Sequence, residues 1–145
     1  MPKIYIPVAI QRAILELSKG YCEYCVLPSN FSTDFFHYEH IMPLVLNGKT
    51  ELKNLASSCG ICNNHKHDKI KHTDPLTKQT VRLYHPRQDV WRDHFQWSDD
   101  ALNIVGITPA GRATVDLLKL NRLNAVNLRK LLKMADLHPP YFIID

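Results

Sequence analysis

The chain has 145 residues, of which 45% are hydrophobic, and a formal net charge of +4. This length suits a single domain, or one small module with an extension, that buries a core without disulfide staples. The sequence contains neither the apolar region of a secretory signal nor a stretch long enough to span a membrane, so we expect a cytoplasmic protein with no membrane partner.

The first half predicts a helix, two strands and a second helix. Residues 7–19 place their apolar side chains on one helical face, with Pro7 suited to the first turn and Gly20 to the C-cap. Residues 34–43 carry the aromatic and branched side chains typical of a strand, and the expected partner strand is 55–58, after a turn at 47–48. A short helix over 59–69 completes the order β, β, α.

The second half predicts a loop near 74–75, a helix over 88–95, and a hairpin that joins 95–97 to 102–107. Thr108-Pro109 supplies the N-cap and the first-turn proline of another helix. Residues 122–135 predict an amphipathic helix whose polar face carries Arg122, Arg129 and Lys133. This face is either solvated or in contact with DNA, and the composition favours a solvated face.

Basic residues are concentrated in two stretches. Residues 60–92 hold seven Lys/Arg against three Asp, and residues 112–133 hold six against one. Such stretches attract polyanions because they neutralise phosphates and release counterions, although ordinary solvated helix faces have a similar composition. The charge pattern therefore favours a nucleic-acid partner without choosing between DNA and RNA.

The four cysteines form two close pairs, Cys22-x-x-Cys25 and Cys59-x-x-Cys62, separated by 33 residues. In a reducing compartment this pattern is more typical of metal ligands than of disulfides. Zn²⁺ prefers four thiolates in a closed tetrahedral structural site. We therefore expect a zinc ion that stabilises the fold and takes no part in catalysis, since a closed site has no position for water.

Further motifs lie between and after the cysteines: Glu39-His40-Ile41-Met42-Pro43, Asn54-Leu55, and Asn63 to Lys66 directly after Cys62. In this order and spacing the motifs resemble the HNH endonucleases and their ββα-metal active site, over roughly residues 21–71. The resemblance implies an α+β fold with an HNH core over 1–72, held by the zinc site. A hairpin-plus-helices extension over 73–145 is expected to pack on this core as a single domain.

The resemblance also implies an activity, the metal-dependent hydrolysis of phosphodiester bonds in DNA, most often duplex DNA. His40 matches the general base of the family, a role that suits histidine because its pKa lies near neutrality. Asn54 matches the amide that positions this histidine. Glu39, Asn63 and His67 match ligands of a catalytic ion, and oxygen ligands favour Mg²⁺ or Mn²⁺.

Two points bear on this assignment of ligands. Alternation along a strand sends the side chains of Glu39 and His40 to opposite faces, so a local distortion is needed if both serve one site. If they are not metal ligands, Glu39 is a solvated strand carboxylate and Asn63 is a helix-capping residue. His67 is one helical turn after Asn63 and is a secondary candidate.

Three basic residues are candidates for contact with DNA: Lys66, which matches the trailing basic residue of the family, Lys69 and Arg87. Arg87 belongs to the run His85-Pro86-Arg87, which with Trp91 and Trp97 resembles an extension of stand-alone bacterial HNH proteins. The two tryptophans are expected in the core. The alternative function is a zinc-stabilised nucleic-acid-binding module without cleavage, which would have no need of Glu39, His40 and Asn63 together.

Overall fold

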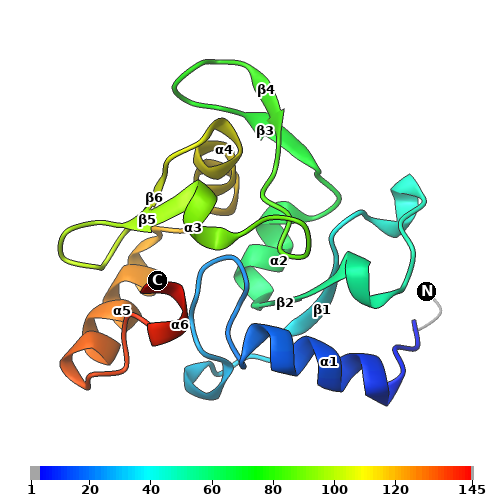
Figure 1. Ribbon diagram of the computed structural model, residues 1–145, viewed down its shortest axis with the longest axis horizontal. Helices are drawn as coiled ribbons and strands as arrows, with labels where there is room; N and C mark the ends of the chain where they lie inside the picture. Colours follow the sequence, from blue (N-terminus) through cyan, green and yellow to red (C-terminus); the bar gives the residue numbers. More distant parts are fainter. Residues whose placement is uncertain (1–3, 145) are drawn as a thin grey trace.

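The computed structural model describes residues 4–144, and Figure 1 shows the arrangement of its elements. They are α1 (Val8–Ser18), β1 (His37–His40), β2 (Leu55–Ser58), α2 (Gly60–Lys66), β3 (Lys71–Thr73), β4 (Thr80–Arg82), α3 (Trp91–His94), β5 (Phe95–Trp97), β6 (Ile104–Gly106), α4 (Pro109–Leu118), α5 (Leu123–Met134) and α6 (Tyr141–Ile144). The strands pair consecutively into three antiparallel two-stranded sheets within the described residues. The α+β prediction is confirmed.

The β1–β2 hairpin and α2 form the centre of the first half, in the predicted order. The register pairs His37 with Ser58 and His40 with Leu55. Helix α2 begins after Cys59, whose Sγ accepts the backbone N–H of Cys62 and so caps the helix. Helix α1 packs on β2 and η3 (Leu52–Asn54), and ends at Lys19, which has a left-handed φ of 53°.

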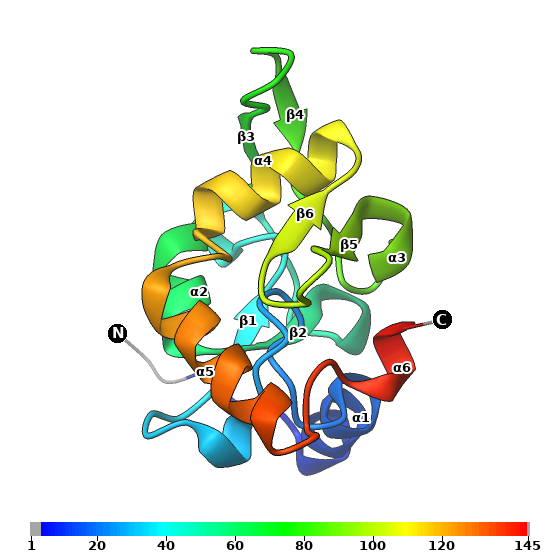
Figure 2. The same ribbon diagram turned by 90° about the vertical axis from the view of Figure 1, so that its left-hand side faces the viewer.

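In the second half, α3 packs on β5 and α4 packs on β6. Thr108 caps α4 as predicted, accepting the backbone N–H of Gly111 through its side chain. Helix α4 packs on β6, on α2 and on the β3–β4 hairpin, which stands at one end of the molecule in Figures 1 and 2. This hairpin surrounds the loop predicted near 74–75 and was not expected, because its strands are short and polar. Helix α6 was not expected either, and α3 is shorter than predicted.

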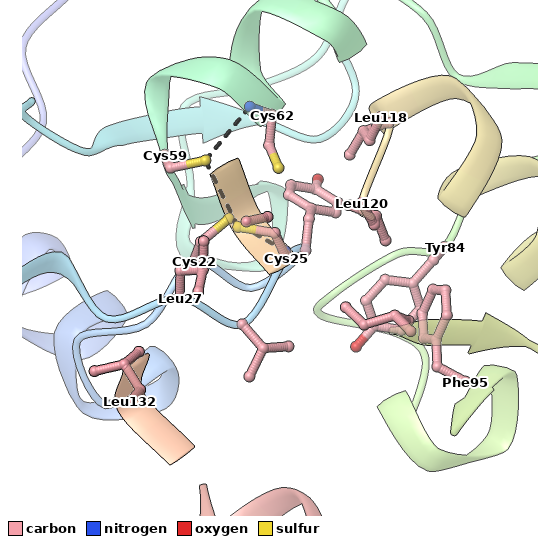
Figure 3. Close-up of a cluster of buried hydrophobic side chains, with 14 residues drawn as sticks. Cys22, Cys25, Leu27, Cys59, Cys62, Tyr84, Phe95, Leu118, Leu120 and Leu132 are labelled. Atoms are coloured by element: carbon pink, nitrogen blue, oxygen red, sulfur yellow. Dashed lines mark hydrogen bonds between the residues drawn. The ribbon is translucent and has the colours of Figure 1, made fainter. Parts of the chain in front are cut away.

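One hydrophobic core joins the two halves of the sequence. The four cysteines belong to the same buried cluster as Phe95, Ile104, Leu118 and Leu120 from the second half (Figure 3). A smaller cluster under α1 contains Ile6, Ile14 and Leu55. No helix of the described residues is long and apolar enough to cross a membrane.

Helix α5 differs from its predicted pattern. The helix forms where expected, but Arg129 has 0% of its surface exposed and Leu131 has 63%. The prediction of Arg129 on a solvated face was wrong, because the guanidinium finds carbonyl partners inside the protein. It donates to Leu102 O at 2.9 Å, Leu120 O at 2.7 Å and Cys25 O at 3.0 Å.

Candidate active site and metal centre

The four cysteines are positioned to hold a metal ion. Their Sγ atoms all lie within 4.8 Å of one another, and all four side chains are buried (Figure 3). The backbone N–H of Cys25 donates to Cys22 Sγ at 3.5 Å, and that of Cys62 to Cys59 Sγ at 3.4 Å. These bonds stabilise thiolates, and four thiolates are the donor set of a structural zinc. The site is therefore consistent with the predicted zinc clip.

Two arginines from the second half lie beside this thiolate cluster. Arg122 directs its guanidinium at Cys59 Sγ, 3.5 Å away, and at Cys62 Sγ, 3.6 Å away. Burial acts to lower the pKa of Arg122, and the negative thiolates outweigh it and raise the pKa. Arg129 is more deeply buried, and burial lowers its pKa to about 10 against the opposing effect of Cys25. No described carboxylate forms an ion pair with either arginine, and the negative groups that act to raise the pKa of both are the cysteines.

His40 lies at the end of β1 and is half-buried. Its Nε2 is 2.9 Å from Thr50 Oγ1, in the loop that leads to β2. Desolvation and the nearby ammonium of Lys66 both lower the pKa of His40. The neutral imidazole, the form able to accept a proton, is therefore favoured.

Asn54 holds the loop that follows His40. Its Oδ1 accepts the backbone N–H of Met42 at 2.8 Å, and its Nδ2 donates to Met42 O at 3.0 Å and to Lys49 O at 2.8 Å. The loop also needs Gly48, since a Cβ there would lie 1.7 Å from Met42 O. Asn54 is thus placed to fix the backbone two residues after His40, and its role in positioning His40 stays a prediction.

Glu39 belongs to a buried polar cluster. Its Oε1 forms a 2.6 Å ion pair with Lys66 Nζ, and its Oε2 accepts the hydroxyl of Tyr24 at 2.6 Å. The Lys66 ammonium also donates to Ile41 O at 2.8 Å. Glu39 is 4% exposed and Lys66 is 1% exposed. Burial raises the pKa of Glu39, and the ammonium of Lys66 opposes that shift. The cluster ties β1 to α2.

Comparisons with known proteins identify the region that contains these residues. Residues 22–69 match the family model described as HNH endonuclease. The chain carries an HNH domain. It is also 30% identical, over 148 aligned residues, to the Septu protein PtuB of Bacillus thuringiensis. That alignment includes 88% of this chain and 52% of the relative, so the chain spans about half of the relative's length.

The three expected ligands of a catalytic ion differ in how far their side chains are already engaged. Both carboxylate oxygens of Glu39 are engaged, as strand alternation would produce. Helix α2 ends at Lys66, so the next residue, His67, lies outside the helix and has a positive φ of 51°. The His67 ring is exposed and lies 3.1 Å from Asp68. Asn63 is half-buried on α2, with no side-chain hydrogen bond among the described residues. Of the three candidates, only Asn63 offers a free oxygen in this arrangement.

Two of the three candidate DNA contacts are also placed differently from the expectation. Lys66 is buried, with 1% of its surface exposed. Arg87 forms a bidentate ion pair with Glu23 at 2.6 and 2.8 Å. The Arg87 side chain is 9% exposed, which removes it from any DNA surface. Lys69, just after α2, is exposed and remains available.

Three residues of the site were missed in the sequence. Thr50 gave no signal, because a threonine after a turn is ordinary. Tyr24 and Glu23 lie between the first two cysteines. Their position next to metal ligands was the one sequence signal that could have indicated a structural role. Glu23 joins Arg87 to β2 by also accepting the backbone N–H of Ser57 at 2.7 Å.

Proposed function

We propose that this chain is an endonuclease that hydrolyses phosphodiester bonds in DNA, with His40 as the general base. The observation that carries the proposal is the environment of His40, which lies within the matched residues 22–69 in a sequence pattern that resembles the HNH motif. The His40 ring is oriented by Thr50, and its pKa is lowered. We expect the protein to act in the cytoplasm, where reducing conditions keep four thiols available to zinc.

The proposed mechanism uses the tautomer of His40 that carries its proton on Nε2. In this tautomer Nε2–H donates to the Thr50 hydroxyl, and Nδ1 keeps its lone pair. Nδ1 removes a proton from a water molecule as its oxygen attacks the phosphorus, in line with the departing 3′ oxygen. The bond from phosphorus to the 3′ oxygen breaks, and that oxygen takes a proton from solvent. The products are a 5′-phosphate and a 3′-hydroxyl, as the resemblance implies.

The proposed activity depends on Mg²⁺ or Mn²⁺, which would neutralise the phosphate and stabilise the departing oxygen. Of the three candidate ligands, Asn63 is the one whose side-chain oxygen has no hydrogen bond among the described residues. Glu39 is able to serve as a ligand only if its ion pair with Lys66 opens, and His67 only if its ring turns from Asp68.

The test is cleavage of supercoiled plasmid by wild type and by His40→Ala, each with EDTA, Mg²⁺ or Mn²⁺, after equal zinc content has been verified. We expect metal-dependent nicking or linearisation by wild type, and a rate reduced about 10²- to 10⁴-fold in His40→Ala. Equal rates for the two proteins would remove His40 from the mechanism.

A zinc-stabilised nucleic-acid-binding module is the second candidate. It is favoured by one observation, the use of Glu39 in an internal ion pair. Absence of cleavage by folded, zinc-loaded wild type, together with retention on DNA, would support this candidate over the nuclease.

A further inference from the structure

A cavity of about 530 Å³ lies beside the loop that follows His40. One wall comes from the HNH domain, including Met42, Asn54 and Lys49. The other wall comes from residues 70–88, including Lys71 and His85, which lie beyond the region matched by the family model. The second half of the chain therefore completes a cavity that the HNH domain only begins.

The walls of this cavity are basic. Five Lys or Arg side chains line it, and Glu51 is the one acidic residue among its lining residues. Two of the five are occupied elsewhere: Lys66 by Glu39 and Arg82 by Asp89. Lys53 is close to Glu51 at 3.6 Å. Lys49 and Lys71 are exposed and form no ion pair among the described residues, so both ammonium groups are free to meet an anion.

His85 adds a neutral hydrogen-bond donor to the same wall. Its Nδ1 accepts the backbone N–H groups of Arg87 and Gln88, both at 3.2 Å. An Nδ1 that accepts hydrogen bonds carries no proton, so the neutral ring is protonated on Nε2. Desolvation lowers the pKa of His85 and favours this neutral form. The ring, which lines the cavity, therefore keeps an N–H group that no described residue accepts.

We infer that the cavity binds the phosphodiester backbone of a DNA strand next to the cleaved bond, through Lys49, Lys71 and the Nε2–H group of His85. Mobile ammonium groups and a fixed N–H donor suit phosphate oxygens, and they provide position without base specificity. The cavity is adjacent to the reaction site because Asn54, which lines it, also holds the backbone after His40. This inference rests on the proposed function, since it takes DNA as the substrate.

The first experiment measures binding without cleavage. Labelled duplex DNA is titrated by fluorescence anisotropy with zinc-loaded His40→Ala protein, without added Mg²⁺ or Mn²⁺, over a series of salt concentrations. The test variant adds Lys49→Gln and Lys71→Gln, and the matched control adds Arg12→Gln and Lys130→Gln, two exposed charges on α1 and α5 that do not line this cavity. Each lost phosphate contact reduces the slope of log K against log salt by about 0.9, so we expect a reduction of about 1.8 for the test variant and none for the control.

The second experiment tests the Nε2–H donor of His85 while keeping an acceptor in place of Nδ1. In His85→Asn the side-chain oxygen replaces Nδ1 as the acceptor for the backbone, and the Nε2–H donor is lost. We expect DNA binding about tenfold weaker than that of the parent protein at low salt, with an unchanged melting temperature. Unchanged affinity would remove His85 from the binding site.

The outcomes distinguish this inference from the proposed function. An unchanged salt slope in the lysine variant, or an equal reduction in the control, would overturn the cavity as a strand site, while plasmid cleavage would still support the nuclease. No binding of duplex DNA at low salt would overturn both proposals. If replacing the two lysines reduces the salt slope for RNA but not for DNA, DNA is overturned as the occupant.

Discussion

At the scale of single residues, the state of His40 sets the pH range of the proposed reaction. Burial and Lys66 lower its pKa from the usual value of about 6.5. A protonated ring has no lone pair to accept a proton, so activity is lost as the pH falls through this pKa and is present above it. We predict that single-turnover cleavage rates rise with pH to a plateau, with a midpoint below about 6.5.

An NMR titration of the His40 ring in protein without DNA supplies the direct comparison. The ring should titrate at the same lowered pKa that the cleavage profile gives. A ring that titrates at or above the usual value would contradict the environment described for His40, and a rate profile with a different midpoint would mean that another group limits the reaction.

The motifs predicted single residues well where chemistry fixes their spacing, and poorly where a partner comes from far along the chain. The cysteine pairs locate the metal cluster, and the positioning role of Asn54 stays a prediction that its hydrogen bonds to the loop after His40 support. Charged residues were assigned to solvent or to DNA because charge usually indicates exposure. Arg87 instead pairs with Glu23 and Arg129 donates to Cys25 O, and nothing local in the sequence indicates either partner.

At the scale of elements, the ion pair between Glu39 and Lys66 joins β1 to α2. Removing one partner of a buried pair leaves the other charge uncompensated, which costs about 3 to 5 kcal/mol, whereas removing both is much less costly. We predict that Glu39→Gln and Lys66→Met each lower the free energy of unfolding by about this amount. The double variant should lose clearly less than the sum of the two.

Urea denaturation of the four proteins, each zinc-loaded, gives the double-mutant cycle. Lys53→Met is the matched control, because the pair of Lys53 with Glu51 is 3.6 Å long and the Lys53 side chain is 82% exposed. Such surface pairs contribute about 0 to 1 kcal/mol. Additive losses at Glu39 and Lys66 would show that the two side chains do not act as a buried pair.

Elements with a strong periodic or capping pattern were predicted, and those that depend on tertiary contacts were not. The β1–β2 hairpin follows from its aromatic and branched residues, and α4 from Thr108-Pro109. The β3–β4 hairpin has three-residue strands of largely polar composition. It is held instead by Asp74, whose carboxylate accepts the Arg112 side chain of α4 at 2.9 Å. This contact spans 38 residues and cannot be inferred from local patterns.

At the scale of the whole molecule, the metal cluster and the second half of the chain share one core. The segment 73–145 was expected to pack on the core of 1–72 as a single domain, and Phe95 and Leu118 lie in the same buried cluster as Cys25 and Cys62. Arg122 adds an electrostatic link, since four thiolates around Zn²⁺ keep a net charge of about −2 that its guanidinium offsets. We therefore propose that the two units fold together and not one after the other.

The two tryptophans allow this cooperativity to be measured. Trp91 and Trp97 are the only tryptophans of the chain, both belong to the second half, and both pack against the shared core. Because zinc binding contributes folding free energy, its removal should loosen that core and not only the clip. We predict that a zinc chelator changes tryptophan emission with the same kinetics as zinc release, followed by a coloured indicator. Emission that stays constant while zinc leaves would mean that residues 73–145 fold independently of the metal centre.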